Sequence, residues 1–420
     1  MAANNSSGTA DESDQLLLLV FLSVGVMAAS SSILSVSLPF RFQALNLPVV
    51  DYGLVVGGYA LGMLILETFW GTHAFRLTDY RLILLLGACV LVLILMLGFL
   101  TTFVALLLDY TALGALVIYL VPLQRFVGMH AKGPSSEGRG VGRTWAFFGG
   151  GLAAGSAVGP LLFTTLGFEG DVVVATLLMI CAIVLAALTP WKAARLPKLR
   201  EKAVSGFRAV VSMPFVRVAL LVVAAYVVYS LPSNYLPYYA VTFFGASQAE
   251  TGYILGAARV VSLLASFFLG SWGDRHGHPR AVLISFALLA VGVIGTWFAP
   301  NAIVMTIGTL AMFAGIGWLS SSLLPLAMAP IPTRHRGSAI GLYGSMEDLG
   351  LLVGPVLYGV IWSGWGAHFI FPMALAAALV GLVLTLPYVL RSANSRVEGG
   401  DASEPNSDEA VDAEGLEPLH

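Results

Sequence analysis

The residues Gly270-Ser271-Trp272-Gly273-Asp274-Arg275-His276-Gly277-His278-Pro279-Arg280 separate two long apolar stretches. About twenty mostly apolar residues flank this polar segment on each side, which is the length of one membrane-crossing helix. Glycine, proline and adjacent charges within so few residues predict a tight loop. The segment is therefore expected to join two membrane helices.

Composition supports the same interpretation for the whole chain. Of the 420 residues, 58% are apolar and 10% are charged, whereas soluble domains have about 45–50% and about 25%. Apolar stretches of this length must be helical in lipid, so that every backbone amide finds a partner within its own segment. We expect an all-α membrane protein with twelve transmembrane helices, at residues 15–40, 52–71, 81–101, 103–123, 142–165, 171–191, 217–243, 250–272, 281–299, 302–328, 337–362 and 367–390.

Basic residues are distributed unevenly among the connections between these spans. Seventeen follow the even-numbered spans, and one, Arg41, lies in the opposite connections. Because Lys and Arg concentrate in cytoplasmic loops, both termini are expected in the cytoplasm, and the number of spans should be even. The protein is expected in the cytoplasmic membrane. Residues 1–14 and 391–420 are acidic tails, and the second is expected to be disordered.

An internal repeat relates the two parts of the chain. Gly53 to Gly71 and Gly252 to Gly270 both span eighteen residues, with a further glycine at the same offset in each. The motif Gly-x-x-x-Gly-Pro also occurs twice, as Gly155, Gly159 and Pro160 and as Gly350, Gly354 and Pro355. We therefore expect two six-helix bundles, residues 15–191 and 217–390, joined by a basic linker at residues 192–216.

The loop at residues 270–280 resembles the loop signature of the major facilitator superfamily, Gly-x-x-x-Asp-Arg-x-Gly followed by a base. The resemblance covers residues 15–390 and implies a carrier whose halves rock around a central substrate site. The expected gating-loop residues are Gly270, Asp274, Arg275 and Gly277, with Gly71 and Arg76 from a first copy of the loop that has Phe75 in place of the aspartate.

This loop and the glycine-proline motifs each have two alternative functions. The resemblance implies that Asp274 latches the outward-facing state against the start of the fifth span. The alternative is that Asp274 and Arg275 only cap and solvate the loop. The motif ending at Pro160 resembles the core of the family's antiporter motif but lacks its following glycines, which favours efflux by antiport. The alternative is close helix packing, shared with the copy that ends at Pro355.

Charged residues inside the expected spans are candidates for the transport pathway. Insertion of a charge at mid-bilayer costs about 2.5–3.5 kcal/mol or more, so such residues usually face a cavity or a partner. Arg259, Glu347 and Asp348 are expected at similar depth, with one acid pairing with Arg259 and the other titrating or meeting substrate. The alternative is an ion pair that only fixes helix packing. Also inside spans are Glu67, expected near the inner surface, and Asp109, a pathway or outer-mouth residue.

The seventh span adds Asn234 and Tyr235, which lie between Pro232 and Pro237, as pathway candidates. Because desolvation favours the neutral form of a carboxyl group, acids in a poorly hydrated cavity suit proton coupling. With one base at the midplane, a medium-sized, partly apolar substrate is expected rather than a multivalent anion.

We therefore expect a secondary active transporter of a small molecule, proton-coupled and with efflux favoured, that works as a monomer. An uptake symporter or facilitator is the alternative, and a substrate sensor on a carrier scaffold or a membrane enzyme are alternatives from other classes. The seven histidines lie in loops, at span edges or in the tail, so an enzyme is not expected. No cofactor, metal ion or nucleic acid is expected to bind, and the chain has no phosphate-binding loop of the Gly-x-x-x-x-Gly-Lys-Ser/Thr type.

Overall fold

The computed structural model describes residues 6–73, 79–114, 123, 134–189, 213–331 and 336–400, which form helices joined by short turns. The helices are α1 (Ser6–Ala44), α2 (Val49–His73), α3 (Asp79–Leu97), α4 (Phe103–Leu113), α6 (Pro134–Leu188), α8 (Met213–Ser230), η3 (Leu231–Tyr235), α9 (Leu236–Phe244), α10 (Gln248–His276), α11 (His278–Trp297), α12 (Ala302–Met328), α13 (Arg336–Trp365), η5 (Ala367–Phe369) and α14 (Ile370–Gly400).

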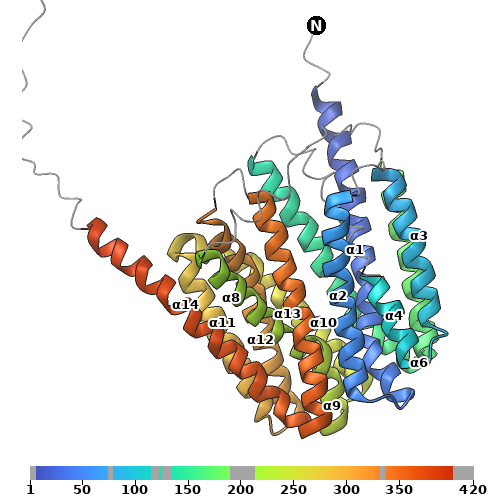
Figure 1. The fold of residues 1–420 in the computed structure, drawn as a ribbon. Helices are drawn as coiled ribbons and strands as arrows, with labels where there is room; N and C mark the ends of the chain where they lie inside the picture. The colour runs from blue at the N-terminus through green and yellow to red at the C-terminus, as the bar shows by residue number, and fades with distance from the viewer. Residues whose placement is uncertain are drawn as a thin grey trace, which may run out of the picture.

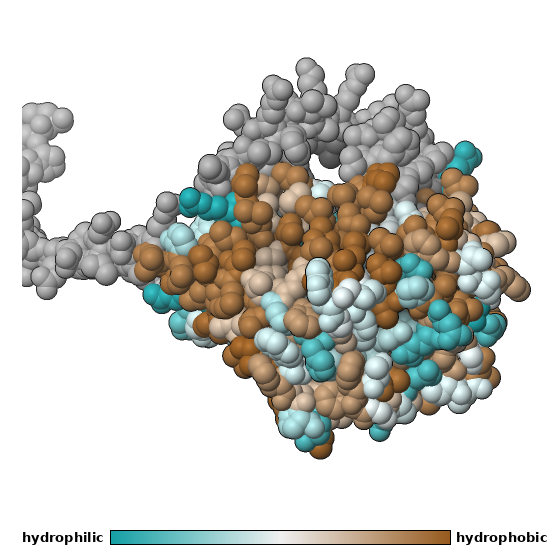
Figure 2. All heavy atoms as spheres, turned by 60° about the horizontal axis from the view of Figure 1, so that its bottom comes forward, coloured by the Kyte–Doolittle hydropathy of each residue, from teal (hydrophilic) through white to brown (hydrophobic). Residues whose placement is uncertain are grey.

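Most of these helices are long and apolar enough to cross a membrane. Within the described residues, eight segments meet that condition, and three shorter apolar helices accompany them. Large apolar side chains such as Phe267, Val104 and Ile303 are exposed on the outside, as lipid-facing residues would be. Figure 2 shows brown apolar flanks around a face that carries more polar residues. The expected all-helical membrane fold is confirmed.

The helices form a single bundle in which early and late segments face each other. In Figure 1, α1, α3 and α4 gather on the right and α8, α11 and α14 on the left, with α2, α10 and α13 between them. Helix α1 packs along α6, and α11 packs along α12. Two further contacts join the part of the chain before residue 190 to the part after residue 212, namely α2 with α13 and α6 with α10.

Helix α6 turns sharply at Gly167. Its backbone there has φ 72° and ψ −177°, a conformation that is essentially restricted to glycine. The bend falls between the expected fifth and sixth spans and reverses the chain direction without a long loop. Arg41 at the end of α1 lies 3.1 Å from Glu169 and stacks over the ring of Phe168, which fixes the bend against α1.

Replacing Gly167 with alanine is expected to lower the free energy of unfolding by about 1–2 kcal/mol, because a Cβ atom makes this positive φ strained. Thermal unfolding in detergent micelles measures the effect. Gly142→Ala on the same helix is the matched control, since a Cβ atom there would meet nothing within 4 Å. Equal unfolding temperatures for both variants would contradict the prediction.

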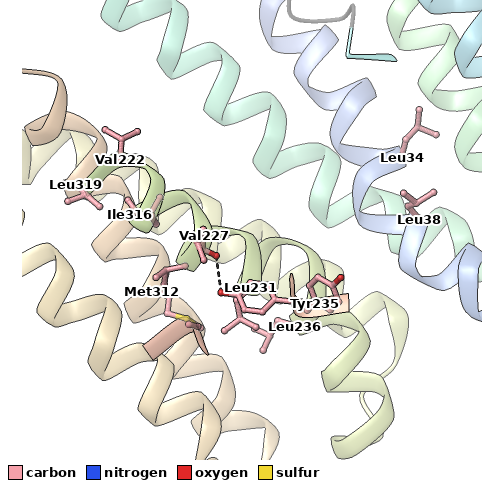
Figure 3. Close-up of a cluster of buried hydrophobic side chains, with 14 of the residues drawn as sticks. Leu34, Leu38, Val222, Val227, Leu231, Tyr235, Leu236, Met312, Ile316 and Leu319 are labelled. Carbon is pink, nitrogen blue, oxygen red and sulfur yellow. Dashed lines mark hydrogen bonds between the residues drawn. The ribbon is translucent and has the colours of Figure 1, made fainter. Parts of the chain in front are cut away.

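The seventh expected span is interrupted by a π-helical turn, η3. Proline has no backbone N–H, so Pro232 and Pro237 each remove one helical hydrogen bond. The chain instead closes a wider turn in which the N–H of Leu236 donates to the carbonyl of Leu231. Asn234 Nδ2 donates to the carbonyl of Ser230 at 3.1 Å. Apolar residues of α8 and η3, among them Val222 and Leu231, pack against Met312, Ile316 and Leu319 of α12 (Figure 3).

Three helix ends differ from the expected boundaries. Helix α10 continues to His276, so Gly270 to Arg275 belong to its last turns, and the chain turns only at Gly277 with φ 102°. Gly270 and Gly273 do not break this helix, which ends at Gly277. At the chain ends, α1 begins at Ser6, inside the expected tail, and α14 continues to Gly400. Residues 391–400, which were expected to be disordered, are helical.

Candidate functional site

The centre of the bundle is occupied by Arg259 of α10, whose side chain reaches into the earlier part of the chain. The residue is buried, with 9% of its surface exposed. Its Nη1 donates to Ser32 Oγ of α1 at 2.7 Å and to the carbonyl of Leu152 of α6 at 3.2 Å. Ser156 Oγ, 2.9 Å from Ser32 Oγ, extends this polar group. Arg259 thus bridges three helices through neutral acceptors.

The ion pair expected for Arg259 is not formed. Within the described residues, the acid–base contacts are Arg41 with Glu169 and His278 with Asp274. The prediction that Glu347 or Asp348 pairs directly with Arg259 is therefore wrong in this conformation. The two acids lie on α13, and the side chain of Arg259 is turned toward α1 and α6 instead.

The two adjacent acids of α13 interact with different helices. Tyr226 of α8 donates to Glu347 Oε1 at 2.6 Å, and Tyr343, one turn earlier on α13, also hydrogen-bonds Glu347. Asp348 is almost fully buried and lies close enough to Tyr59 of α2 to interact electrostatically. Since neighbouring helical residues diverge by about 100°, Glu347 is turned toward α8 and Asp348 toward α2.

Tyrosine rings connect these charged groups. Tyr59 packs against Tyr110 of α4 with 5.2 Å between ring centroids. Tyr110 and Tyr229 of α8 both lie close enough to Arg259 to interact electrostatically, and Tyr229 also contacts Phe313 of α12. Arg259, the tyrosines and Asp348 therefore form one connected group at the middle of the bundle.

Two buried acids lie outside this group. Asp109, beside Tyr110 on α4, is 7% exposed, and within the described residues its Oδ2 has no hydrogen-bond partner. Asp171 is fully buried on α6 beside Ser37 of α1. Asp171 is the first residue of the expected sixth span and was not among the candidates from the sequence. The side chain of Glu67 lies outside the described residues.

Asn234 and Tyr235 take part in a seam that joins α2 to α13 at the end of the bundle away from the start of α1. Tyr52 of α2 donates to the Asn234 carbonyl at 3.1 Å. Tyr235, which is fully buried, donates to the Pro355 carbonyl at 2.6 Å, and its ring contacts that of Tyr52. In this conformation these residues close the bundle rather than line an open passage.

The glycine-proline motifs make corresponding contacts in both copies. Gly155 and Gly159 lie against the backbone of α1, whereas Gly350 and Gly354 lie against α8. The two prolines face glycines of other helices, Pro160 facing Gly252 of α10 and Pro355 facing Gly53 of α2. Gly53 and Gly252 are the residues that the internal repeat pairs. Each motif therefore packs on one helix and meets a glycine of a second helix. The contacts of α2 with α13 and of α6 with α10 at this end are together called the seam below.

The contact between α6 and α10 loosens along the bundle. At the seam, a Cβ atom on Gly252 would lie 3.0 Å from the carbonyl oxygen of Ser156, and one on Gly256 would lie 3.1 Å from that of Ala153. Toward the other end, a Cβ atom on Gly149 would meet only the side chain of Leu263, at 3.3 Å. Of these three glycines, the two at the Gly252 end lie close to the backbone of the facing helix, and Gly149 does not.

The expected gating loop lies at the loose end. Asp274 is 71% exposed and contacts His278 Nε2 at 3.5 Å, one turn further along the chain. Gly270 and Arg275 belong to the last turns of α10, and Gly277 ends the helix. Gly71 lies on α2, and Arg76 lies outside the described residues. The side chains at the start of α6, against which Asp274 was expected to latch, lie outside the described residues, so the latch stays a prediction.

Comparison with known proteins identifies the family. The sequence matches the family model of the Major Facilitator Superfamily over residues 20–262 and again over residues 218–411. The chain belongs to the major facilitator superfamily. That superfamily is a family of membrane transporters and not of enzymes, as expected.

Relatives and solved structures agree with this membership. The multidrug resistance protein Stp of Mycobacterium tuberculosis is 31% identical over 166 residues, which are 39% of this chain and 30% of that protein. A triacylglyceride transporter of Mycolicibacterium hassiacum is 32% identical over 136 residues, 32% of this chain and 24% of that protein. The chain thus spans less than a third of the length of these curated relatives.

Two solved transporter structures each cover nearly the whole chain. The crystal structure of a nucleoside transporter NupG variant has a TM-score of 0.73 at 12% identity and covers 89% of this chain and 99% of that one. A POT family transporter in complex with a thioalcohol-conjugated peptide has a TM-score of 0.72 at 14% identity, covering 90% and 96%. At such low identity the likeness shows the fold alone.

Proposed function

We propose that this superfamily member is a proton-coupled secondary active transporter that expels a small molecule by alternating access. The observation that carries the proposal is the connected group of Arg259, tyrosines, Glu347 and Asp348 at the middle of the bundle, below a seam formed by two pairs of helices. Titratable side chains at the membrane midplane are expensive and mark ion or substrate pathways. The partial likeness to Stp, named as a multidrug resistance protein, favours efflux.

The proposal includes twelve membrane crossings in two bundles, residues 15–191 and 217–390, joined at residues 192–216. The eight long segments and three shorter helices support this number once the segment bent at Gly167 is counted as two. The start of α1 and the end of α14 lie toward one side of the bundle (Figure 1), in agreement with an even number. With both termini in the cytoplasm, as the basic residues indicate, the seam lies at the end of the bundle away from the cytoplasm. In this proposal the structure corresponds to a cytoplasm-facing state of a monomer.

Transport in proteoliposomes with an imposed pH gradient tests this function, with a panel of small molecules and pyranine fluorescence to follow protons. We expect Glu347→Gln or Asp348→Asn to lower proton-coupled flux at least about tenfold, because each removes one of the midplane titratable groups. Glu169→Gln is the matched control, because it removes a carboxylate that is exposed at the bend of α6 and pairs with Arg41 there, away from the midplane group. Unchanged pH dependence in both acid variants would contradict the proton-coupling role.

A further inference from the structure

Arg259 holds a buried positive charge that no described carboxylate neutralises at close range. Its known hydrogen bonds run from Nη1 to a hydroxyl and a carbonyl, Ser32 Oγ and Leu152 O. Its Nε is buried and has no hydrogen-bond partner within the described residues. One edge of the guanidinium is therefore unsatisfied at the centre of the protein.

A buried cation in this condition is costly. Burying a charge without a counter-charge is far less favourable than burying a neutral polar group, and neutral acceptors compensate it only in part. Guanidinium is a planar fork whose donors match the two oxygens of a carboxylate. Binding of an anionic group at the Nε edge would satisfy both the charge and the unused donor.

Tyrosine side chains are the neighbours that interact electrostatically with Arg259. Tyr110 and Tyr229 lie near its guanidinium. Behind them, the ring centroid of Tyr59 lies 5.2 Å from that of Tyr110, and those of Tyr226 and Phe313 each lie 5.9 Å from that of Tyr229. Such rings present flat apolar faces, which pair favourably with other aromatic rings.

Charge limits what else the site accepts. Arg259 is the one base inside the described membrane segments at this depth, while Glu347 and Asp348 lie on α13 in the same group. A second negative charge on the ligand would meet these acids without a second base. The site therefore fits a single anionic group on an apolar body.

We propose that Arg259 binds the carboxylate or sulfonate of an aromatic monoanion, which exchanges with Ser32 and Leu152 as the acceptor for the guanidinium. This inference rests on the proposed transport function and specifies the class of its substrate. Tyr110 and Tyr229 would hold the aromatic body.

Binding to the full chain in lipid nanodiscs tests the proposal without requiring transport. The probes are 1-naphthoate, biphenyl-4-carboxylate and indole-3-acetate, each compared with its neutral amide and with a trimethylammonium analogue of the same ring. We expect the carboxylates to bind most tightly, and Arg259→Gln to weaken carboxylate binding by about 10- to 100-fold while changing amide binding less than about threefold. Arg259→Lys should retain part of the preference.

Two further variants separate recognition from packing. Ser32→Ala removes a competing acceptor and keeps the guanidinium, so carboxylate binding should be as tight as in the wild type or tighter. Ser285→Ala, which removes a buried hydroxyl bonded only within α11, controls for general effects on the bundle. Arg259→Gln must also elute as a monodisperse peak with wild-type amide binding, which shows that it is folded.

The outcomes distinguish this inference from the proposed function. No preference for the anion on any of the three rings, or equal losses in Arg259→Gln and Ser32→Ala, would overturn the inference and assign Arg259 a packing role. A protein that moves a neutral probe without charge preference would contradict only the anion inference. A protein that binds the carboxylates through Arg259 but moves none of them in proteoliposomes would contradict only the transport function.

Discussion

Replacing Gly53 with alanine is expected to shift the protein out of the conformation described above. A Cβ atom on Gly53 would lie 2.5 Å from the carbonyl oxygen of Pro355 and 2.5 Å from the hydroxyl of Tyr235. Neither atom can move without separating α13 or breaking the hydrogen bond of Tyr235. Overpacking of this kind costs about 1–3 kcal/mol, and it applies only while α2 and α13 are in contact. The population should therefore shift about 5- to 150-fold toward the state in which the seam is open.

Alkylation of a single cysteine measures this shift without a known substrate. The reporter is Val356→Cys, which lies in the seam opposite Gly57, in a background in which Cys89 and Cys181 are replaced by serine. Its reaction rate with a membrane-impermeant maleimide should rise in Gly53→Ala. Gly364→Ala on α13 is the control, because a Cβ atom there would meet nothing within 4 Å. If the two variants react at the same rate, the seam does not depend on Gly53.

Replacing Gly155 with valine should cost about 3 kcal/mol or more of folding free energy, the largest stability effect we expect. A side chain at Gly155 would run into the carbonyl of Ala29, and its Cβ atom would lie 2.8 Å from Ser32 Cβ. The obstacle is the backbone of α1, so no rotation of a side chain relieves the overlap. Separation of α1 from α6 would also disturb Ser32 and the Arg259 contact.

Thermal unfolding in detergent, compared with Gly150→Val, measures this cost. Gly150 lies on the same helix, and a Cβ atom there would meet nothing within 4 Å, so both variants share the same change in composition and helix propensity. The unfolding temperature should fall in Gly155→Val only. A similar fall in both would mean that the cost comes from placing valine in α6 and not from overlap with α1.

Composition and periodic glycines were sufficient to predict much of the architecture. Long apolar stretches can only be helices in lipid, so the helical membrane fold followed from length and hydropathy. The spacing that paired Gly53 with Gly252, and Pro160 with Pro355, identified the residues that meet across the seam, although which would meet which could not be deduced. That partner choice depends on how the two parts of the chain dock.

The chemistry of the centre was harder to predict because it depends on side-chain direction. Their positions within the expected spans indicated that Arg259, Glu347 and Asp348 share a depth, and a direct ion pair was the simplest expectation. The guanidinium instead reaches Ser32, which is 227 positions away in the sequence, since the approach of α10 to α1 and α6 decides its partners. The burial of Asp171 could not be predicted, because it depends on the bend at Gly167. Hydropathy does not reveal such a bend.

The π-helical turn at Leu231–Tyr235 changes the direction in which the side chains after it point. A turn that holds an additional residue rotates everything after it by about 100° relative to a regular helix. With this offset, Tyr238 and Tyr239 of α9 contact Trp362, and Tyr239 also reaches His368. Deletion of one residue from the turn would rotate this aromatic patch away from the end of α13 while α8 kept its own packing on α12. The extra residue thus allows the continuous segment of α8, η3 and α9 to pack on α12 with one part and on the end of α13 with the other.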